Sequence, residues 1–110
     1  MLLEGVQLMK IILVKTGAFP CIMNVPHELT SLQALVGGNI EVVEPFDDDV
    51  ILVCNECGRN EGRPVNRVIN SHMDICGDFF LCGQDEYGLS DIPEEKITPY
   101  LDRFQLYPAG

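Results

Sequence analysis

Two cysteines three positions apart, Cys54 and Cys57, are the residues with the clearest potential for chemistry, and Gly58 follows them directly. Two thiolates at this spacing on a tight turn can form half of a structural zinc site, which needs four ligands. His72 and Cys76 downstream would complete a Cys3His set in the pattern Cys-x2-Cys-x14-His-x3-Cys. Zinc is therefore kept as an alternative assignment, with these four residues as ligands.

The same pair of cysteines has simpler interpretations. Cys54 ends an apolar run and fits a protein core, while Cys82 is left over in another apolar segment, where cysteine behaves as a small hydrophobe. A redox role needs a thiol of lowered pKa, and the negative charge of Glu56 between the two cysteines would raise it. The favoured interpretation is a core cysteine and a turn cysteine, with Gly58 supplying an unusual backbone angle in a hairpin turn. No cofactor is expected on this interpretation.

The rest of the sequence has no pattern typical of an enzyme active site. It contains no Gly-rich phosphate loop, no HExxH motif and no nucleophile elbow. His27 and His72 are far apart in sequence, and the acidic run at 47–49 lacks the spaced oxygen ligands of a calcium loop. We therefore expect a non-enzymatic protein.

Composition and charge narrow the classes of partner. The chain has 110 residues, enough for one domain, and 46% of them are hydrophobic, as in an ordinary globular protein. The 17 acidic and 7 basic residues give a net charge of −10, which disfavours direct binding to phosphate backbones. A protein partner is therefore expected. An acidic mimic of nucleic acid, which would occupy a DNA-binding protein, stays open as a further alternative.

The five cysteines and the N-terminal residues bear on location. An odd number of cysteines without a secretory signal favours free thiols in a reducing cytoplasm. No apolar run approaches the ~18 residues needed to span a membrane, so no membrane association is expected. Residues 1–9 are interpreted as a possible N-terminal extension of little structural weight, and 10–110 as a single α+β domain.

The order of expected elements defines the fold class. Strands are expected at 10–16 and 21–26 as a β-hairpin, then at 39–45, 50–54 and 78–83, with 63–70 extended at its start. A helix is expected over 32–36, capped by Thr30 or Ser31 and ended by Gly37 and Gly38. The apolar run at 50–54 indicates a central strand covered on both faces. A second helix is expected from Ser90 or Asp91 onward, with Pro93 in its first turn and a kink or restart at Pro99. The sequence thus predicts an α+β fold: a β-hairpin, a helix, a mostly antiparallel sheet of three to four further strands, and a C-terminal helix.

Several of these segments together resemble a known family. "SLQALVGGNIEVVEP", "DDDVILVCNECGRNEGRPVNRVI", "ICGDFFLCG" and "YLDRF" are similar to the pattern of the domain of unknown function DUF3846, over roughly residues 10–104. The resemblance rests most on a strand ending in Asn55-Glu56, a Gly turn, and then Pro64-x-Asn66-Arg67. It implies a small cytoplasmic protein of bacterial, phage or mobile-element type, with no assigned activity. The family pattern does not depend on Cys57 or on the pair of His72 and Cys76.

The family pattern thus includes four polar residues and does not depend on the full set of proposed zinc ligands. Asn55, Glu56, Asn66 and Arg67 would lie on adjacent limbs of one hairpin and could form a single network. This network could stabilise the hairpin through side chain to backbone bonds and a Glu–Arg pair. It could also bind a ligand or a partner, so these four residues are the candidate binding site. The function that we expect is a binding or regulatory module that acts through a protein partner.

Overall fold

The computed structural model describes residues 7–105, which form eight strands, two α-helices and one 3-10 turn. In chain order the elements are β1 (Leu8–Val14), β2 (Cys21–Pro26), α1 (Leu29–Val36), β3 (Ile40–Val43), β4 (Ile51–Asn55), β5 (Val65–Asn70), β6 (Met73–Cys76), β7 (Phe79–Asp85), β8 (Gly88–Ser90), the 3-10 turn η1 (Glu94–Lys96) and α2 (Ile97–Arg103).

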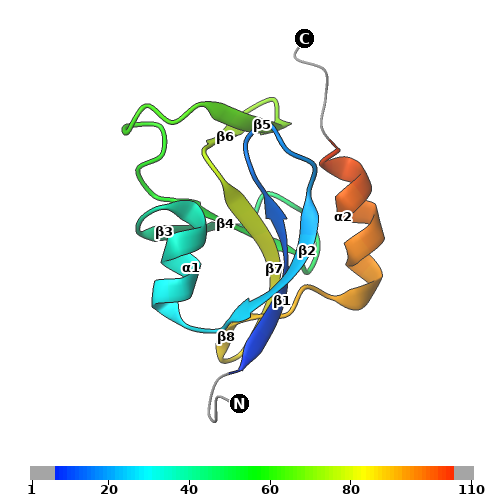
Figure 1. The fold of residues 1–110 in the computed structure, drawn as a ribbon. Helices are drawn as coiled ribbons and strands as arrows, with labels where there is room; N and C mark the ends of the chain where they lie inside the picture. The colour runs from blue at the N-terminus through cyan, green and yellow to red at the C-terminus, as the bar shows by residue number, and fades with distance from the viewer. Residues whose placement is uncertain (1–6, 106–110) are drawn as a thin grey trace.

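A six-stranded sheet forms the centre of the molecule. Its strand order is β2-β1-β7-β4-β3, and β8 pairs with the far end of β7. Strands β5 and β6 form a separate two-stranded sheet, which lies at the top of the molecule in Figure 1. Every strand pair in residues 7–105 is antiparallel. Strands β2 and β3 are therefore the two edges of the large sheet.

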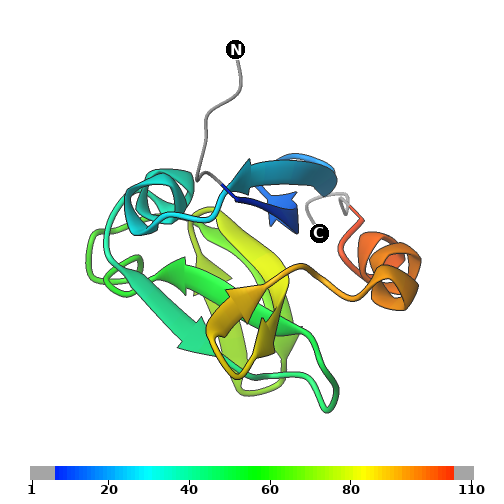
Figure 2. The same ribbon diagram turned by 90° about the horizontal axis from the view of Figure 1, so that it is seen from below.

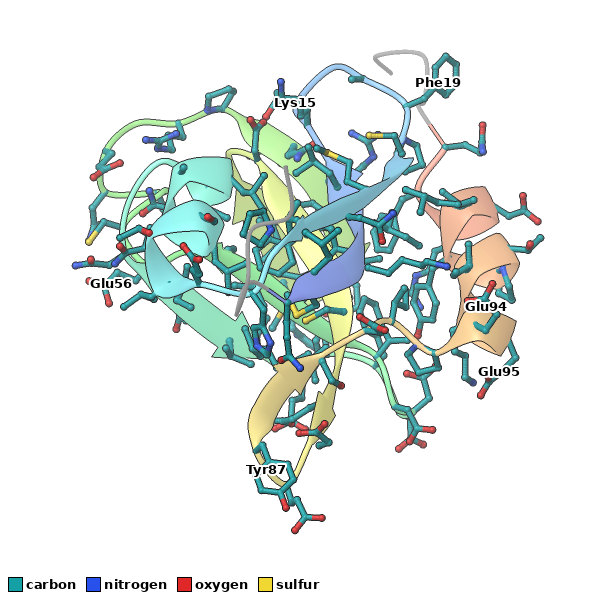
Figure 3. The ribbon with its side chains drawn as sticks, turned by 60° about the horizontal axis from the view of Figure 1, so that its bottom comes forward. Lys15, Phe19, Glu56, Tyr87, Glu94 and Glu95 are labelled. Carbon is teal, nitrogen blue, oxygen red and sulfur yellow. The ribbon has the colours of Figure 1, made fainter. Side chains whose placement is uncertain are left out.

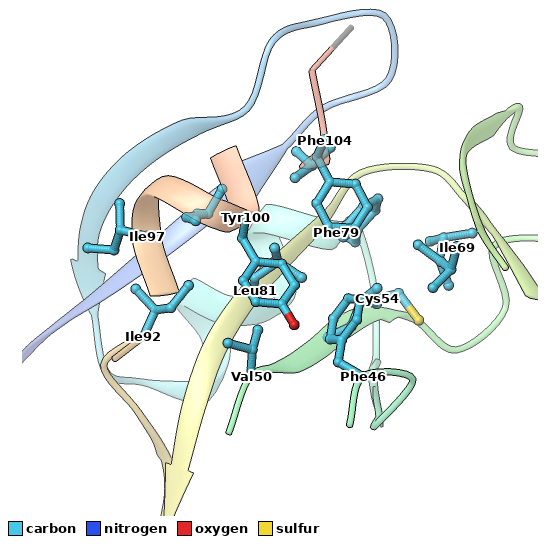
Figure 4. Close-up of a cluster of buried hydrophobic side chains, with 14 residues drawn as sticks. Phe46, Val50, Cys54, Ile69, Phe79, Leu81, Ile92, Ile97, Tyr100 and Phe104 are labelled. Atoms are coloured by element: carbon cyan, nitrogen blue, oxygen red, sulfur yellow. The ribbon is translucent and has the colours of Figure 1, made fainter. Parts of the chain in front are cut away.

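One helix covers each face of the large sheet, as Figures 1 and 2 show. Helix α1 packs Leu32 and Val36 against a buried cluster that includes Ile11, Val53 and Phe80. On the opposite face, α2 packs against a second cluster, in which the rings of Phe46, Phe79, Tyr100 and Phe104 meet (Figure 4). The architecture is α+β with an antiparallel sheet and a C-terminal helix, which confirms the predicted fold class.

The position of β4 in the sheet explains the unbroken apolar run from Ile51 to Cys54. All five of its residues are buried. Leu52 and Cys54 belong to the cluster beneath α2, and Ile51 and Val53 belong to the cluster beneath α1. Successive side chains in a strand point to opposite faces, so a strand covered on both faces is apolar except where a buried polar side chain, here Asn55, is hydrogen-bonded. The prediction of a central strand here is confirmed.

The boundaries of the first elements differ from the sequence expectation. Strand β1 begins at Leu8, and Met9 is buried, so these two residues belong to the sheet and not to an N-terminal extension. Residues 1–6 of that extension lie outside the described residues. Helix α1 begins at Leu29 after Glu28, so Thr30 and Ser31 lie inside the helix and do not cap it. The amide of His27 still bonds to the carbonyl of Gln7 at 2.8 Å, and this continuation of the β1–β2 ladder leaves little room for a separate capping turn.

The end of α1 is as predicted. Gly37 has φ 78°, in the left-handed region that favours glycine, and its amide bonds to the carbonyl of Gln33 at 2.8 Å.

The hairpin expected around Cys54 and Cys57 does not form. Strand β4 pairs with β3 and β7, whereas β5 pairs with β6 in the other sheet. Between them, residues 56–62 form consecutive turns, with bonds from Glu61 to the carbonyl of Cys57 at 2.8 Å and from Arg63 to that of Gly58 at 3.0 Å. Local sequence indicated a turn correctly, but it did not indicate which strands would pair on either side.

The predicted start of the C-terminal helix at Ser90 or Asp91 is also wrong. Ser90 ends β8, and the carboxylate of Asp91 accepts a bond from the amide of Lys10 at 2.9 Å, so neither residue caps a helix. The chain instead passes Pro93 into the 3-10 turn and starts α2 at Ile97. Pro99 therefore lies in the first turn of α2, where its missing amide leaves no helix bond unmade. The predicted kink or restart at Pro99 is therefore wrong in position, because the change from 3-10 turn to α-helix comes two residues earlier, between Lys96 and Ile97.

A polar contact ties the loop before β4 to α2. The carboxylate of Asp48 accepts bonds from the Tyr100 hydroxyl at 2.7 Å and the Val50 amide at 2.8 Å, and Lys96 lies 3.4 Å away. Partial burial alone would raise the pKa of Asp48, but the bonds from Tyr100 and Val50 and the charge of Lys96 outweigh burial, so this pKa is lowered.

Tyr100→Phe is expected to lower the free energy of unfolding by about 1–2 kcal/mol near neutral pH, because it removes a hydrogen bond to a charged group. A lowered folded-state pKa means that the contribution of Asp48 is present above its unfolded pKa of about 4 and is lost as pH falls through the folded pKa. Urea unfolding of the parent and the variant at neutral and acidic pH measures this. A stability difference that does not shrink in acid would contradict the assignment.

Candidate functional site

The four polar residues predicted as one site lie in two separate networks. Asn55 ends β4 and is 5% exposed. Its side-chain amide donates to the carbonyl of Val36 at 3.1 Å, and its side-chain oxygen accepts from the amide of Cys57 at 2.7 Å. Asn55 therefore joins the end of α1 to the turn after β4. These bonds are made to backbone groups, as expected of a structural asparagine.

Glu56 continues this first network at the surface. Its carboxylate accepts a bond from the side chain of Asn39 at 3.1 Å, and Asn39 in turn accepts one from Gln33 of α1 at 3.1 Å. Glu56 is exposed at the side of the molecule that carries α1 (Figure 3). Of the two residues in this network that the sequence singled out, Glu56 is the one that a partner could reach.

Asn66 and Arg67 form the second network, on β5. The side-chain amide of Asn66 donates to the carbonyls of Val14 at 2.8 Å and Gly77 at 3.0 Å. Arg67 is 6% exposed, and its guanidinium donates to the carbonyls of Ala18 at 2.8 Å and Phe104 at 3.1 Å. These bonds hold the small sheet against the end of β1, the β1–β2 loop and the end of α2.

The single network expected of these four residues therefore does not form. Asn55 and Glu56 contact α1 and its following loop, whereas Asn66 and Arg67 contact β1 and α2. The two pairs separate because β4 and β5 belong to different sheets. Burial leaves little of Asn55 or Arg67 for a partner to touch.

Gly58 has a packing role that differs from the predicted one. Its φ is not positive; the positive φ in this loop belongs to Gly62, at 74°. A Cβ atom on Gly58 would lie 2.5 Å from the carbonyl oxygen of Cys76, inside the closest contact that such atoms tolerate. Glycine at this position therefore lets the turn after β4 pass directly against β6.

The proposed zinc ligands do not come together. Cys54 and Cys76 line one cavity of about 240 Å³ between the two sheets, and Cys57 and His72 do not line it. His72 lies in the β5–β6 turn, where its amide bonds to the side chain of Asn70 at 2.8 Å. Within residues 7–105, no three His, Cys, Asp or Glu side chains gather in a way that could hold a metal ion. This arrangement gives the Cys3His alternative no support.

The thiols differ strongly in exposure, and burial raises the pKa of two of them. Cys21 is exposed, whereas Cys54 and Cys82 are buried. Burial raises the pKa of Cys54 to about 11, with a smaller contribution from the charge of Glu41. Burial also raises the pKa of Cys82 to about 12, although a bond from the backbone of Ser90 opposes the shift. Neither thiol has the lowered pKa that redox chemistry requires.

A thiol reagent at mildly alkaline pH is therefore expected to label Cys21 first and to leave Cys54 and Cys82 unlabelled until the protein unfolds. The reactive species is the thiolate, which is scarce at these two buried sites. Mass spectrometry of peptides after timed labelling measures the order. Labelling of Cys54 at the rate of Cys21 would show that the interior near β4 is open.

The outer edge of β2 is a candidate binding surface that the sequence alone did not reveal. Within residues 7–105, β2 pairs with β1 and with no other strand. In an antiparallel pair, residues alternate between directing their backbone amide and carbonyl at the partner strand and directing them away. The direction at each residue of β2 therefore decides what its outer edge offers.

Two observations fix this alternation. The amide of His27 donates to the carbonyl of Gln7, which is the next pair after Leu8 and Pro26 in the register. Lys10, opposite Asn24, directs its amide to Asp91 at 2.9 Å and its carbonyl to the amide of Ile92 at 2.9 Å, both away from β2.

The backbone groups of Cys21, Met23 and Val25 consequently face β1, and those of Ile22 and Asn24 face outward. Pro26, which has no amide to lose, falls in the outward set, as is usual for proline on an edge strand.

The two edges of the sheet are protected very differently. Strand β3 has four residues, carries Glu41 and is followed by Glu44 and Pro45, all features that discourage the pairing of another strand. Strand β2 has six residues and no charged side chain. The absence of charge in "CIMNVP" was the available signal, but the sequence did not show that this strand is an edge.

Exposed apolar side chains accompany the β2 edge. Ile22 is 47% exposed, and Phe19, in the loop before β2, is 63% exposed. Figure 3 shows Phe19 projecting from this loop, near the end of α2. Backbone groups that face outward beside exposed apolar side chains are the usual components of a site that binds an extended peptide segment.

No helix within residues 7–105 is long and apolar enough to cross a membrane. No curated protein and no solved structure matches the chain. A family model described as Domain of unknown function (DUF3846) matches residues 9–105, nearly the whole chain. The resemblance expected from the Asn55-Glu56 and Pro64-x-Asn66-Arg67 segments is thus confirmed, and the chain belongs to the DUF3846 family.

Proposed function

We propose that this protein is a non-enzymatic binding module that acts through a protein partner, and that the partner adds an extended strand to the outer edge of β2. The observation that carries this proposal is the outward direction of the backbone groups of Ile22 and Asn24 on an edge strand without charge. An added strand would gain backbone hydrogen bonds there and apolar contact with Ile22 and Phe19.

The partner is proposed to be a protein because the net charge of −10 repels nucleic acid. The acidic mimic is less well supported, since mimicry needs carboxylates arrayed like phosphates. Three carboxylates instead make local contacts: Asp48 with Tyr100, Asp74 with Arg59, and Glu61 with Arg63. The family resemblance supports an origin in a bacterium, a phage or a mobile element, and the thiols support a cytoplasmic location.

Affinity capture from the source cells tests the proposal when matched variants are compared. Ile22→Asp places a charge on the β2 edge, and Val68→Asp makes the same change at an exposed valine on the small sheet. The parent and Val68→Asp are expected to retain a common protein that Ile22→Asp loses. A capture pattern that Ile22→Asp leaves intact, or that both variants lose equally, would overturn the β2 edge as the binding surface.

A further inference from the structure

The end of helix α2 lies near the start of β2. At the start of β2, Arg67 bonds both to the carbonyl of Ala18, in the loop before the strand, and to that of Phe104, at the end of α2. Farther along β2, Asn24 is opposite Lys10, whose ammonium lies 3.4 Å from the carboxylate of Glu94 in η1. Figure 1 shows α2 next to the first part of β2, whereas the rest of the strand runs away from the helix. A strand added to β2 would therefore extend the sheet on the side of the molecule that carries η1 and the end of α2.

The surface of η1 and α2 carries excess negative charge. Glu94, Glu95 and Asp102 are exposed, and Figure 3 shows Glu94 and Glu95 at the outside of this segment. The two basic residues of the same segment contact neighbouring groups, and Glu94 pairs with Lys10, so Glu95 and Asp102 carry the remaining negative charge. Lys96 lies 3.4 Å from Asp48, and the guanidinium of Arg103 lies 4.7 Å from the centre of the Phe46 ring.

The strand register indicates which side chains of an added strand would meet this charge. Ile22 and Asn24 share a sheet face with Ile12 and Lys10, their direct neighbours on β1. This is the face covered by α2, because Ile12 belongs to the cluster beneath that helix. Alternate side chains of the added strand would point to the same face.

We infer that the partner segment is an extended basic segment, with Lys or Arg at alternate positions on the face shared with α2. This inference rests on the proposed function, since it describes the segment that the β2 edge would take. Opposite charges on the partner segment and on the surface of η1 and α2 would speed association and fix the register of the added strand. A second copy of this chain fits less well, because it would bring together two molecules of charge −10.

Synthetic peptides of about ten residues, close to the length of long strands, provide the probes for the full chain. One alternates lysine with valine, and a second alternates glutamate with valine. A third has the lysine–valine sequence with alternate backbone amides methylated, so that it keeps its charge but cannot complete a β-ladder. The lysine–valine peptide is expected to bind at least about tenfold more tightly than either control, and to weaken as salt is raised from about 50 to 300 mM.

The outcomes separate the inference from the proposed function. Equal binding of the lysine and glutamate peptides, with no binding of the methylated one, would overturn the basic segment and leave strand addition intact. Equal binding of the lysine peptide and its methylated form would mean attraction by charge alone, and would overturn both. Failure of the lysine peptide to bind would overturn the inference, while the capture experiment still decides the proposed function.

Matched protein variants localise the charge effect. Glu94→Gln with Glu95→Gln neutralises the segment beside β2, and Asp85→Asn with Glu86→Gln removes the same charge at the β7–β8 turn. The first pair is expected to weaken binding of the lysine peptide about three- to tenfold more than the second. Equal weakening by the two double variants would overturn the placement of the bound peptide near η1 and α2. Sedimentation that shows a dimer lost on Asn24→Pro would assign the edge to a second copy and also overturn the inference.

Discussion

Replacing Arg67 with alanine is expected to lower the free energy of unfolding by about 3–5 kcal/mol, a large part of the stability of a domain this size. The buried guanidinium bonds to the carbonyls of Ala18 and Phe104 and to the side-chain oxygen of Asn66, at 2.7 Å. Its removal leaves buried acceptors without partners and opens a void where the small sheet, the β1–β2 loop and α2 meet. Urea unfolding of the full chain measures the loss.

Arg59→Ala is the matched control. Arg59 is exposed and forms an ion pair with Asp74, so its loss is expected to cost less than about 1 kcal/mol. If Arg67→Ala does not fold, Arg67→Lys, which keeps the charge but cannot reach all the carbonyls at once, should fold with reduced stability. Stability of Arg67→Ala within about 1 kcal/mol of the parent would contradict a structural role for this arginine.

Proline substitutions at two adjacent positions of β2 are expected to have very different effects. Met23→Pro should destabilise the protein by about 2–4 kcal/mol, because the amide of Met23 faces β1 and its loss breaks the ladder. Asn24→Pro should cost less than about 1 kcal/mol, because the amide of Asn24 faces outward, where no strand of residues 7–105 pairs with β2. Thermal and urea unfolding of both variants measure the difference.

The same pair of variants connects stability to binding. Asn24→Pro should fold normally and yet lose the partner, because it removes an outward amide that an added strand would use. Equal destabilisation by both prolines would show that the direction of the backbone groups along β2 has been assigned wrongly. A stable Asn24→Pro that still binds would show that the partner contacts another surface.

Local sequence was sufficient to predict features that depend on a single local property. The apolar run at 50–54 predicted a strand covered on both faces, and β4 has that position. Gly37 predicted the end of α1, because the left-handed conformation required there favours glycine. In each case a single local property determines the outcome.

Pairing between distant segments could not be predicted in the same way. The turn residues after Cys54 are consistent with a hairpin, but they do not specify that β4 pairs with β7 while β5 pairs with β6. Strand β6 has four residues, too few for its alternation to stand out in the sequence, and it was not expected. The helix starts were misplaced because backbone pairing and a 3-10 turn, not side-chain caps, determine them.

The candidate site likewise combines features that the sequence predicted with features that it could not predict. The sequence identified Asn55 and Arg67 as notable, yet their residue types gave no sign that both are buried and bonded to backbone carbonyls. The β2 edge was overlooked because an edge is a property of the sheet order and not of a strand. The uncharged sequence of β2 indicates a binding edge only when it is known that no strand within residues 7–105 pairs with its outer side.

Amide hydrogen exchange of β2, measured by NMR in the free protein and with the captured partner, tests the central claim most directly. In the free protein, Met23 and Val25 should exchange slowly, while Ile22 and Asn24 should exchange quickly. Addition of the partner should slow exchange at Ile22 and Asn24. A partner that binds and leaves both of these amides in fast exchange would contradict strand addition at the β2 edge.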